Sequence, residues 1–272
     1  MAGEPTIREH AHKKTGKGHG GFRSAPRNHS RGCLLVIGGG EDRTGECALL
    51  RVFAELSGGS GARIVLITTA SGAPEVLSAE YSAAFRRLGA PVVHELRLTS
   101  REQADGEPAL AELALATAVF FTGGDQARLG PLIGSRASLL LRDRLAERTL
   151  AVAGTSAGAT ALGQEMILGG DVTSEPVRTG PGLGLLPGAI VDMHFAQRRR
   201  QSRLAAAIRR HPSYLGIGID EDTAVLVRHG SFNVLGSGVV TTACTARAWP
   251  GVRLRELRLG DRFDLASRQP LR

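Results

Sequence analysis

The chain has 272 residues, of which 42% are hydrophobic and 4% aromatic, a composition typical of a globular α/β protein and not of a disordered or collagen-like one. Its three cysteines are scattered and lack paired spacing, which excludes a disulfide framework or a cysteine zinc site and indicates a reducing compartment. The net charge of +8 is uneven, because seven basic and two acidic residues give the first 32 residues a net charge of +5. We expect a disordered basic tail over 1–32 and a single domain over 33–272.

The basic tail is not followed by an apolar segment of about 7–15 residues, so it does not have the pattern of a secretory signal. The chain also lacks the run of about 18 apolar residues that a membrane-spanning helix needs. We therefore expect a cytoplasmic protein with no membrane partner.

Short apolar runs alternate with segments of helical period, as a parallel sheet with crossover helices requires. In the first half, the pattern predicts strands at 33–37, 64–68, 92–96 and 118–121, with helices at 48–56, 81–88 and 108–115. In the second half, it predicts helices at 138–148, from 159 onward and at 199–210, and strands at 150–153, 190–193 and 216–219. A glycine-rich connection spans 169–188. Three further strands, at 225–228, 231–235 and 238–242, are predicted to form antiparallel hairpins at a sheet edge.

Residues 154–158 read Gly-Thr-Ser-Ala-Gly and lie between a predicted strand and a predicted helix. In this setting a G-x-S-x-G sequence places its serine, here Ser156, at a sharp turn with the hydroxyl held above the sheet. The N–H of Ala157 would then point, with the helix N-terminus, toward a developing oxyanion. The same sequence also suits a glycine-rich turn that only packs closely or binds a phosphate.

A second glycine pair, Gly123-Gly124, follows the strand at 118–121 and precedes Asp125 and Gln126. Gly124 could supply a second N–H to an oxyanion, and Gln126 could bind a substrate amide or carboxylate. The alternative is a helix start with Asp125 as its N-cap.

A serine nucleophile needs a base, and His194 is the best placed of the histidines outside the tail, because it follows a predicted strand as Ser156 does. We interpret His211 as a helix-terminal residue, His229 as part of a hairpin turn and His94 as a residue inside a strand. The acid that orients the base is expected from the group that follows the strand at 216–219, Asp220, Glu221 and Asp222, with Asp192 as a further alternative.

Four arginines, Arg198, Arg199, Arg200 and Arg203, follow His194 within nine residues. They predict a positive surface that holds a carboxylate or favours an acidic substrate, although a solvated helix face is the plain alternative. Nucleic acid is not an expected partner, because aromatic side chains for base stacking are not interleaved with these arginines.

Five segments stand out along the chain: GGGEDR at 38–43, FTGGDQ at 121–126, GTSAGA at 154–159, VDMHF at 191–195 with its trailing arginines, and GIGIDEDTA at 216–224. In these segments and their order the chain resembles the cyanophycinases, serine peptidases related to the aspartyl dipeptidases. One residue departs from the family pattern, because Met193 stands where the family has glutamine.

The resemblance implies a flavodoxin-like α/β sheet related to the class I glutamine amidotransferase fold, with a C-terminal antiparallel hairpin region. It also implies a homodimer without metal or cofactor that releases β-aspartyl-arginine dipeptides from cyanophycin, an aspartate polymer with arginine amide-linked to its side chains. By resemblance, Ser156 is the nucleophile, His194 the base and Glu221 the orienting acid. The substrate-binding group comprises Gln126, Asp192, Arg198, Arg200 and Arg203, and Gly124 and Ala157 form the oxyanion hole.

Two other functions fit the sequence. One is an aspartyl dipeptidase or other acidic-peptide hydrolase with the same three residues and a different pocket, an alternative supported by Met193. The other is a non-catalytic protein that uses the arginines to bind an acidic polymer, although such a binder does not need serine, histidine and acid at strand ends.

Overall fold

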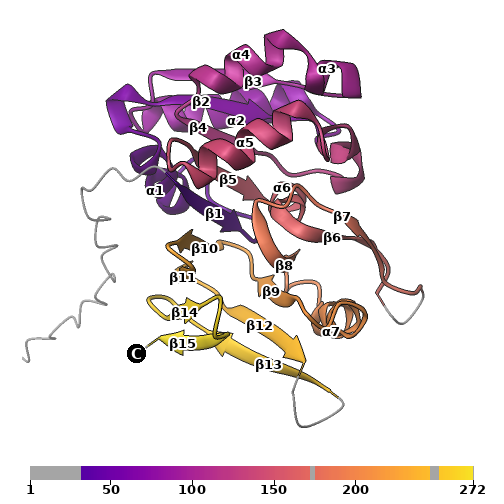
Figure 1. Cartoon of the computed structure of the whole chain (residues 1–272). Helices are drawn as coiled ribbons and strands as arrows, with labels where there is room; N and C mark the ends of the chain where they lie inside the picture. Colours follow the sequence, from indigo (N-terminus) through magenta and orange to yellow (C-terminus); the bar gives the residue numbers. More distant parts are fainter. Residues whose placement is uncertain (1–31, 172–174, 246–250, 272) are drawn as a thin grey trace, which may run out of the picture.

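The computed structural model describes residues 32–171, 175–245 and 251–271, so the predicted basic tail lies outside the described residues except for Gly32. Two β-sheets and the helices that cover them make up the described chain (Figure 1). The predicted α/β class, with a parallel sheet flanked by helices and antiparallel strands toward the C-terminus, is confirmed.

The first sheet has nine strands in the order β15-β14-β11-β10-β1-β5-β4-β2-β3. Its parallel part consists of β1 (Cys33–Ile37), β5 (Ala151–Thr155), β4 (Ala118–Phe121), β2 (Arg63–Ile67) and β3 (Val92–Leu96). Its antiparallel part consists of β10 (Thr223–Arg228), β11 (Ser231–Gly236), β14 (Arg262–Asp264) and β15 (Gln269–Leu271). Strands β1, β4 and β5 are buried throughout, which explains why they read as continuous apolar runs.

Helices cover both faces of the parallel part. The apolar stripes of α1 (Ala48–Leu56) and α2 (Pro74–Arg87) pack on one face, next to the 3₁₀ turn η1 (Gly59–Gly61). The other face carries η2 (Gln126–Leu132), α3 (Arg101–Asp105), α4 (Glu107–Leu115), α5 (Arg136–Ala146) and α6 (Ala157–Leu162). The alternation of side chains along β1 shows this division, because Leu35 faces the first group and Val36 the second.

The second sheet has six strands in the order β13-β12-β9-β8-β6-β7. They are β13 (Val252–Leu257), β12 (Val240–Thr245), β9 (Leu215–Ile219), β8 (Leu186–Met193), β6 (Gly163–Gly169) and β7 (Arg178–Pro181). Helix α7 (Gln201–Arg210) packs on one face through Leu204, Ala207 and Ile208. The other face joins the core of the first sheet, since Val191 and Ile217 lie in the same buried cluster as Val36.

Two predictions about this region were wrong. The helix expected from 159 onward ends at Leu162, because the chain enters β6 at Gly163. Strand β7 and the start of β8 lie within the predicted glycine-rich connection at 169–188. The strand expected at 238–242 does not form a hairpin with β11, because it crosses to the second sheet as β12 and pairs with β9 and β13. The crossing is held by Asp220, whose carboxylate accepts the Val239 N–H at 3.0 Å.

The segment 38–40 after β1 joins the two sheets. The Gly38 N–H donates to the Thr223 carbonyl at 2.9 Å, and the Gly38 carbonyl accepts the His194 N–H at 2.8 Å. The Gly39 carbonyl accepts the Asp222 N–H at 2.9 Å. Residues that follow β1, β8 and β9 thereby meet at one edge, the usual position of a ligand site in an open α/β sheet.

Within the described ranges, no helix is long and apolar enough to cross a membrane.

Candidate active site

Ser156 lies at a strained turn between β5 and α6. Its φ of 52° and ψ of −115° are unusual for a residue with a side chain, and its N–H donates to the Ile37 carbonyl at 3.1 Å. The turn needs a glycine at 158, because a Cβ there would lie 2.4 Å from the Phe121 carbonyl oxygen. This geometry agrees with the strand, turn and helix predicted around the G-x-S-x-G sequence.

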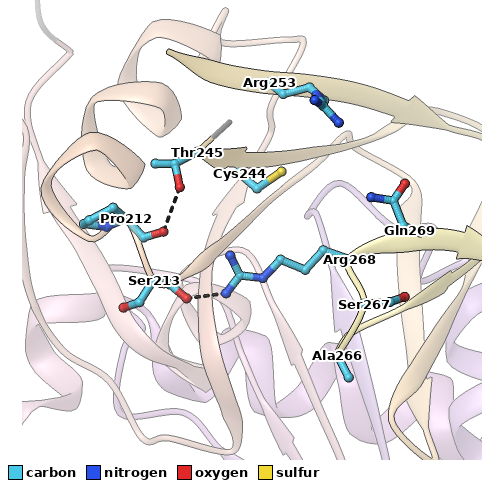
Figure 2. Close-up of a pocket in the computed structure, with 9 residues that line it drawn as sticks. All are labelled: Pro212, Ser213, Cys244, Thr245, Arg253, Ala266, Ser267, Arg268 and Gln269. Carbon is cyan, nitrogen blue, oxygen red and sulfur yellow. Dashed lines mark hydrogen bonds between the residues drawn. The ribbon is translucent and has the colours of Figure 1, made fainter. Parts of the chain in front are cut away.

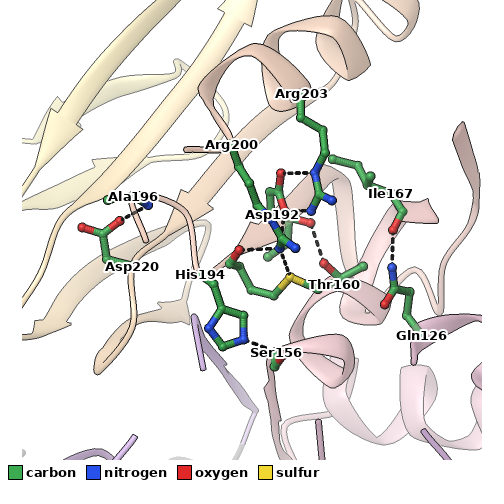
Figure 3. Close-up of polar contacts among 12 residues, drawn as sticks. Gln126, Ser156, Thr160, Ile167, Asp192, His194, Ala196, Arg200, Arg203 and Asp220 are labelled. Atoms are coloured by element: carbon green, nitrogen blue, oxygen red, sulfur yellow. Dashed lines mark hydrogen bonds and ion pairs between the residues drawn. The ribbon is translucent and has the colours of Figure 1, made fainter. Parts of the chain in front are cut away.

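His194 contacts both Ser156 and Glu221. Its Nε2 lies 2.9 Å from the Ser156 Oγ, and its Nδ1 lies 2.6 Å from the Glu221 Oε1. The imidazole is packed against Gly39, where a Cβ would come within 2.4 Å of the ring. The His194 side chain is 11% exposed and that of Glu221 42% exposed, so the chain of contacts opens to solvent at the carboxylate. Figure 3 shows His194 turned toward Ser156.

The acids on either side of Glu221 have structural partners instead. Asp220 is buried and accepts the N–H groups of Ala196, at 2.9 Å, and Val239, at 3.0 Å. Asp222 accepts the Ser237 hydroxyl at 2.9 Å. Of the three acids that the sequence left open, the structure therefore places Glu221 on His194.

The other histidines contact neither Ser156 nor Glu221 within the described residues. His211 ends α7 and lies 3.0 Å from the Thr179 hydroxyl, stacked on Tyr214. His94 lies in the edge strand β3, and His229 lies in the turn between β10 and β11. These positions match the interpretation of the three residues from sequence.

The glycine pair after β4 lies beside the turn at Ser156. A Cβ on Gly123 would be 3.4 Å from the Ser156 Cβ, whereas one on Gly124 would be 2.0 Å from the Ala70 carbonyl oxygen. Asp125 caps η2 by accepting the Ala127 N–H at 2.9 Å, which is the alternative that the sequence left open for this residue. Ala157 is the first residue of α6, where an N–H has no acceptor inside its own helix.

Gln126 is held against the second sheet. Its Nε2 donates to the Ile167 carbonyl at 2.7 Å, which orients the side-chain amide between η2 and β6. Figure 3 shows this contact at the right of the view, beyond Thr160.

Asp192 is fully buried and paired with two of the predicted arginines. The Arg203 Nε donates to its carboxylate at 2.9 Å, with a second contact from Nη2, and the Arg200 Nη1 donates at 3.2 Å. Burial lowers the pKa of Arg200 to about 10, and the adjacent Asp192 opposes that shift, so the guanidinium remains charged at neutral pH. The Arg200 Nη1 also donates to the Met193 carbonyl at 2.6 Å, and the Met193 sulfur lies 2.6 Å from the same nitrogen.

Arg198 differs from these two arginines because its side chain is exposed and has no ion-pair or hydrogen-bond partner among the described residues. The arginine surface predicted from the sequence is therefore divided into a partly buried pair, Arg200 and Arg203, that neutralises Asp192, and an exposed pair, Arg198 and Arg199.

Sequence reasoning missed one buried group beside Ser156. The Glu41 carboxylate, 7% exposed, accepts the Thr155 hydroxyl at 2.7 Å and also accepts the Tyr81 hydroxyl. The signal was present in the GGGEDR segment, which places a glutamate directly after three glycines, but local pattern cannot reveal a partner 114 residues away.

A separate hollow of about 760 Å³ lies between strands β12 and β13 and the turn that joins β14 to β15 (Figure 2). Its lining includes Arg253 and Arg268, and Arg268 donates to the Ser213 carbonyl. None of its nine lining residues belongs to the predicted site, so the hollow is distinct from the group around Ser156.

The arrangement around Ser156 is suited to nucleophilic acyl transfer. A hydroxyl in contact with an imidazole, itself oriented by a carboxylate, is the relationship that activates serine toward a carbonyl carbon. Among the described residues, no three His, Cys, Asp or Glu side chains are grouped so as to hold a metal ion.

Comparison with known proteins gives a consistent result. The family model of peptidase family S51 matches residues 34–235. A cyanophycinase of Trichormus variabilis is 41% identical over 259 residues, covering 88% of this chain and 87% of that protein. A cyanophycinase of Geminocystis herdmanii is 35% identical over 266 residues, covering 90% of this chain and 98% of that protein.

Solved structures support the fold. The crystal structure of a peptidase from an acI-B1 actinobacterium superimposes with a TM-score of 0.67 at 23% identity, covering 88% of this chain and 98% of that one. A putative peptidase E protein from Listeria monocytogenes superimposes with a TM-score of 0.53 at 18% identity, covering 76% of this chain and 98% of that one.

Proposed function

The chain belongs to peptidase family S51 and is a serine-type peptidase, and from this premise we propose that it is an exopeptidase that degrades cyanophycin through Ser156, His194 and Glu221. The observation that carries the assignment of these residues is the continuous contact from the Ser156 hydroxyl through the His194 ring to the Glu221 carboxylate, at 2.9 Å and 2.6 Å.

In the proposed mechanism, Ser156 Oγ attacks the scissile carbonyl carbon while His194 Nε2 accepts the hydroxyl proton. Glu221 holds the Nδ1 proton on the opposite side of the ring and stabilises the imidazolium that forms. The N–H groups of Ala157 and Gly124 bind the oxyanion of the tetrahedral intermediate. His194 then donates its proton to the leaving amine, and water releases the acyl group by the same steps in reverse order.

The substrate assignment rests on the relatives, which are named cyanophycinases. Cyanophycin has an aspartate backbone with arginine on each side chain, so every repeat offers a carboxylate and a guanidinium. We assign the exposed Arg198 to a substrate carboxylate, because its guanidinium is not used by another described residue. Gln126, Asp192, Arg200 and Arg203 complete the pocket, where the buried Asp192 holds the two arginines in place.

The proposed product is the β-aspartyl-arginine dipeptide, and the proposed assembly is a homodimer without metal or cofactor. Light scattering of the purified protein measures the assembly directly, and a monomeric mass would contradict that part of the proposal.

The function is tested by incubating the purified protein with cyanophycin and identifying the released products by mass spectrometry. We expect β-aspartyl-arginine from the wild type and a rate lower by several orders of magnitude from Ser156→Ala, since loss of the nucleophile removes the acyl intermediate. Ser202→Ala, an exposed serine on α7, is the matched control and is expected to retain activity. Release of dipeptide by Ser156→Ala at the wild-type rate would overturn the assignment of Ser156.

A further inference from the structure

We propose that Glu41 is a positioning residue for the nucleophile, acting through the Thr155 hydroxyl to hold Ser156 at hydrogen-bond distance from His194. The inference rests on the proposed role of Ser156 and extends it to a carboxylate that does not itself contact the three reacting residues.

Both oxygens of Glu41 are engaged. Oε2 accepts the Thr155 hydroxyl at 2.7 Å, and Oε1 accepts the Tyr81 hydroxyl. All three side chains are buried, with exposed fractions of 7% for Glu41, 2% for Thr155 and 3% for Tyr81. A buried carboxylate is tolerated only when such donors satisfy it, and hydrogen bonds to a charged acceptor are stronger than neutral ones.

The direction of both hydrogen bonds follows from the chemistry of the donors. Burial raises the pKa of Tyr81 well above its usual range, and the adjacent Glu41 raises it further, so the phenol keeps its proton. The Thr155 hydroxyl has one proton, and Glu41 is the acceptor at 2.7 Å. The carboxylate therefore receives two donors and has little freedom to turn.

The two residues before Glu41 pack against the base and its acid. A Cβ added at Gly39 would lie 2.4 Å from the His194 ring, and one added at Gly40 would lie 3.0 Å from the Glu221 side chain. One short segment, 39–41, thus packs on the base and the acid and bonds to the residue that precedes the nucleophile. It therefore fixes the position of Ser156 relative to His194 and Glu221.

The hydrogen bond from Thr155 to Glu41 lies directly beside the strained turn at Ser156. Ser156 has a φ of 52°, and a non-glycine residue keeps such a conformation only where its surroundings impose it. The Thr155 to Glu41 bond acts on the side chain directly before that turn, and the bond from the Ser156 N–H to Ile37 acts on its backbone. Loss of the Thr155 hydroxyl is expected to let the Ser156 Oγ drift from the His194 Nε2, which lowers reactivity more than substrate affinity.

The experiment uses Thr155→Val, which keeps the shape of the side chain and removes the hydroxyl, and Thr155→Ser, which keeps the hydroxyl. Thr68→Val is the matched control, because Thr68 is fully buried, follows β2 and donates to another carboxylate, that of Glu95, at 2.6 Å. Glu95 belongs to the edge strand β3, separated from β5 by β2 and β4. Each protein is assayed for kcat and KM on cyanophycin, thermal stability, and the rate of labelling by a fluorophosphonate.

We expect kcat and the labelling rate of Thr155→Val to fall about 10-fold to 100-fold with KM changed less than about 3-fold, as for loss of orientation. Thr155→Ser should recover most of the wild-type rate. Thr68→Val should lose a similar amount of thermal stability but react with the probe at the wild-type rate.

Glu41→Gln tests the other end of the contact. The amide offers one acceptor oxygen instead of two, so kcat should fall while KM stays near the wild-type value. If Glu41 acts through Thr155, the two substitutions break the same hydrogen bond, so their effects on kcat should not multiply. The kcat of the double variant Glu41→Gln/Thr155→Val should then lie within about 3-fold of that of the slower single variant.

The outcomes separate this inference from the proposed function. Equal labelling rates in Thr155→Val and the wild type, or equal losses in Thr155→Val and Thr68→Val, would overturn the positioning role of Glu41. A wild-type protein that neither cleaves cyanophycin nor reacts with the probe would instead refute the proposed function.

Discussion

Ser156 and His194 both have a positive φ, of 52° and 48°, which is uncommon for residues with a side chain. Each such residue raises the free energy of the folded chain by about 1–3 kcal/mol, so the surrounding contacts must over-determine the geometry. The His194 N–H donates to Gly38 and the Ser156 N–H to Ile37, so one short stretch of chain fixes both backbones. Strain at the two reacting residues is thus held by the end of a fully buried strand.

Asp42, next to Glu41, provides a prediction about pH. Its exposed carboxylate accepts the N–H groups of Cys47, Gly45 and Thr44 at 2.8–2.9 Å, and these bonds lower its pKa from 3.8 to about 2. Because the pKa is lower in the folded state, the carboxylate stabilises the fold above about pH 3.8, and the effect is lost as the pH falls toward 2.

Asp42→Asn is therefore expected to destabilise the protein at pH 7, with a difference from the wild type that shrinks below about pH 4. Urea unfolding at a series of pH values measures that difference. Glu46→Gln is the control, since this exposed carboxylate in the same loop accepts no hydrogen bond within the described part of the chain. A deficit for Asp42→Asn that is constant from pH 7 to pH 3 would contradict the assignment.

At the scale of the element, α6 connects Ser156, the proposed nucleophile, to the sheet. The helix has six residues, all of them buried, and its first turn packs directly on the backbone of β4. Gly158 permits this approach, since a Cβ there would lie 2.4 Å from the Phe121 carbonyl oxygen and 2.8 Å from its carbonyl carbon. The position of Ser156 thus depends on how closely α6 and β4 pack.

Gly158→Ala is expected to push α6 away from β4, lowering the free energy of unfolding by about 1–3 kcal/mol, the usual effect of overpacking. Activity should fall by more than the loss of folded protein explains, because the shift moves the nucleophile turn. Gly61→Ala is the control, at an exposed position where a Cβ meets nothing within 4 Å. Chemical unfolding and specific activity are measured on both variants, and equal behaviour of the two would refute the close-packing argument.

At the scale of the whole molecule, the two sheets share one buried cluster. It contains Val36 and Val152 from the parallel part of the first sheet, and Val191, Ile217 and Val240 from the second. The segment 38–40 adds backbone hydrogen bonds between them. Neither sheet can lose its partner without exposing apolar side chains to water.

The described chain is therefore expected to unfold as one cooperative unit. Differential scanning calorimetry at a fixed protein concentration should give a single transition, with the calorimetric and van't Hoff enthalpies in agreement. Two resolved transitions, with activity lost in the first, would show that the second sheet unfolds separately and would contradict the expectation of a single domain over 33–272.

The predictions that succeeded depended on local pattern. Buried parallel strands such as 33–37 and 118–121 read as continuous apolar runs, and helices such as 48–56 carry one apolar face, so their periods identify them. Ser156 was selected because a serine between two glycines at the end of a strand fits the G-x-S-x-G pattern, although a closely packed or phosphate-binding turn shares that pattern. His194 was selected because it also directly follows a predicted strand, which is again a feature of the local sequence.

The predictions that failed or stayed open depended on pairing between distant segments. The local sequence of β12 is compatible with pairing to β11 or to β9, and only the crossing between β11 and β12, where Asp220 accepts the Val239 N–H, decides between them. The choice of Glu221 over its neighbours required the path of the backbone, since three adjacent acids look equivalent in the sequence. The pairing of Asp192 with Arg200 and Arg203 was likewise invisible.

The sequence by itself thus determined the α/β class, the order of the main strands and helices and the sharp turn at Ser156, because short-range sterics and the periodicity of burial depend on neighbouring residues. Only the tertiary structure decided that two sheets close over one core, that Glu221 meets His194, and that Glu41 bonds to Thr155 across 114 positions. The physical reason is that contacts between distant segments depend on how whole helices and strands pack together, and this packing cannot be deduced from the residues near each contact.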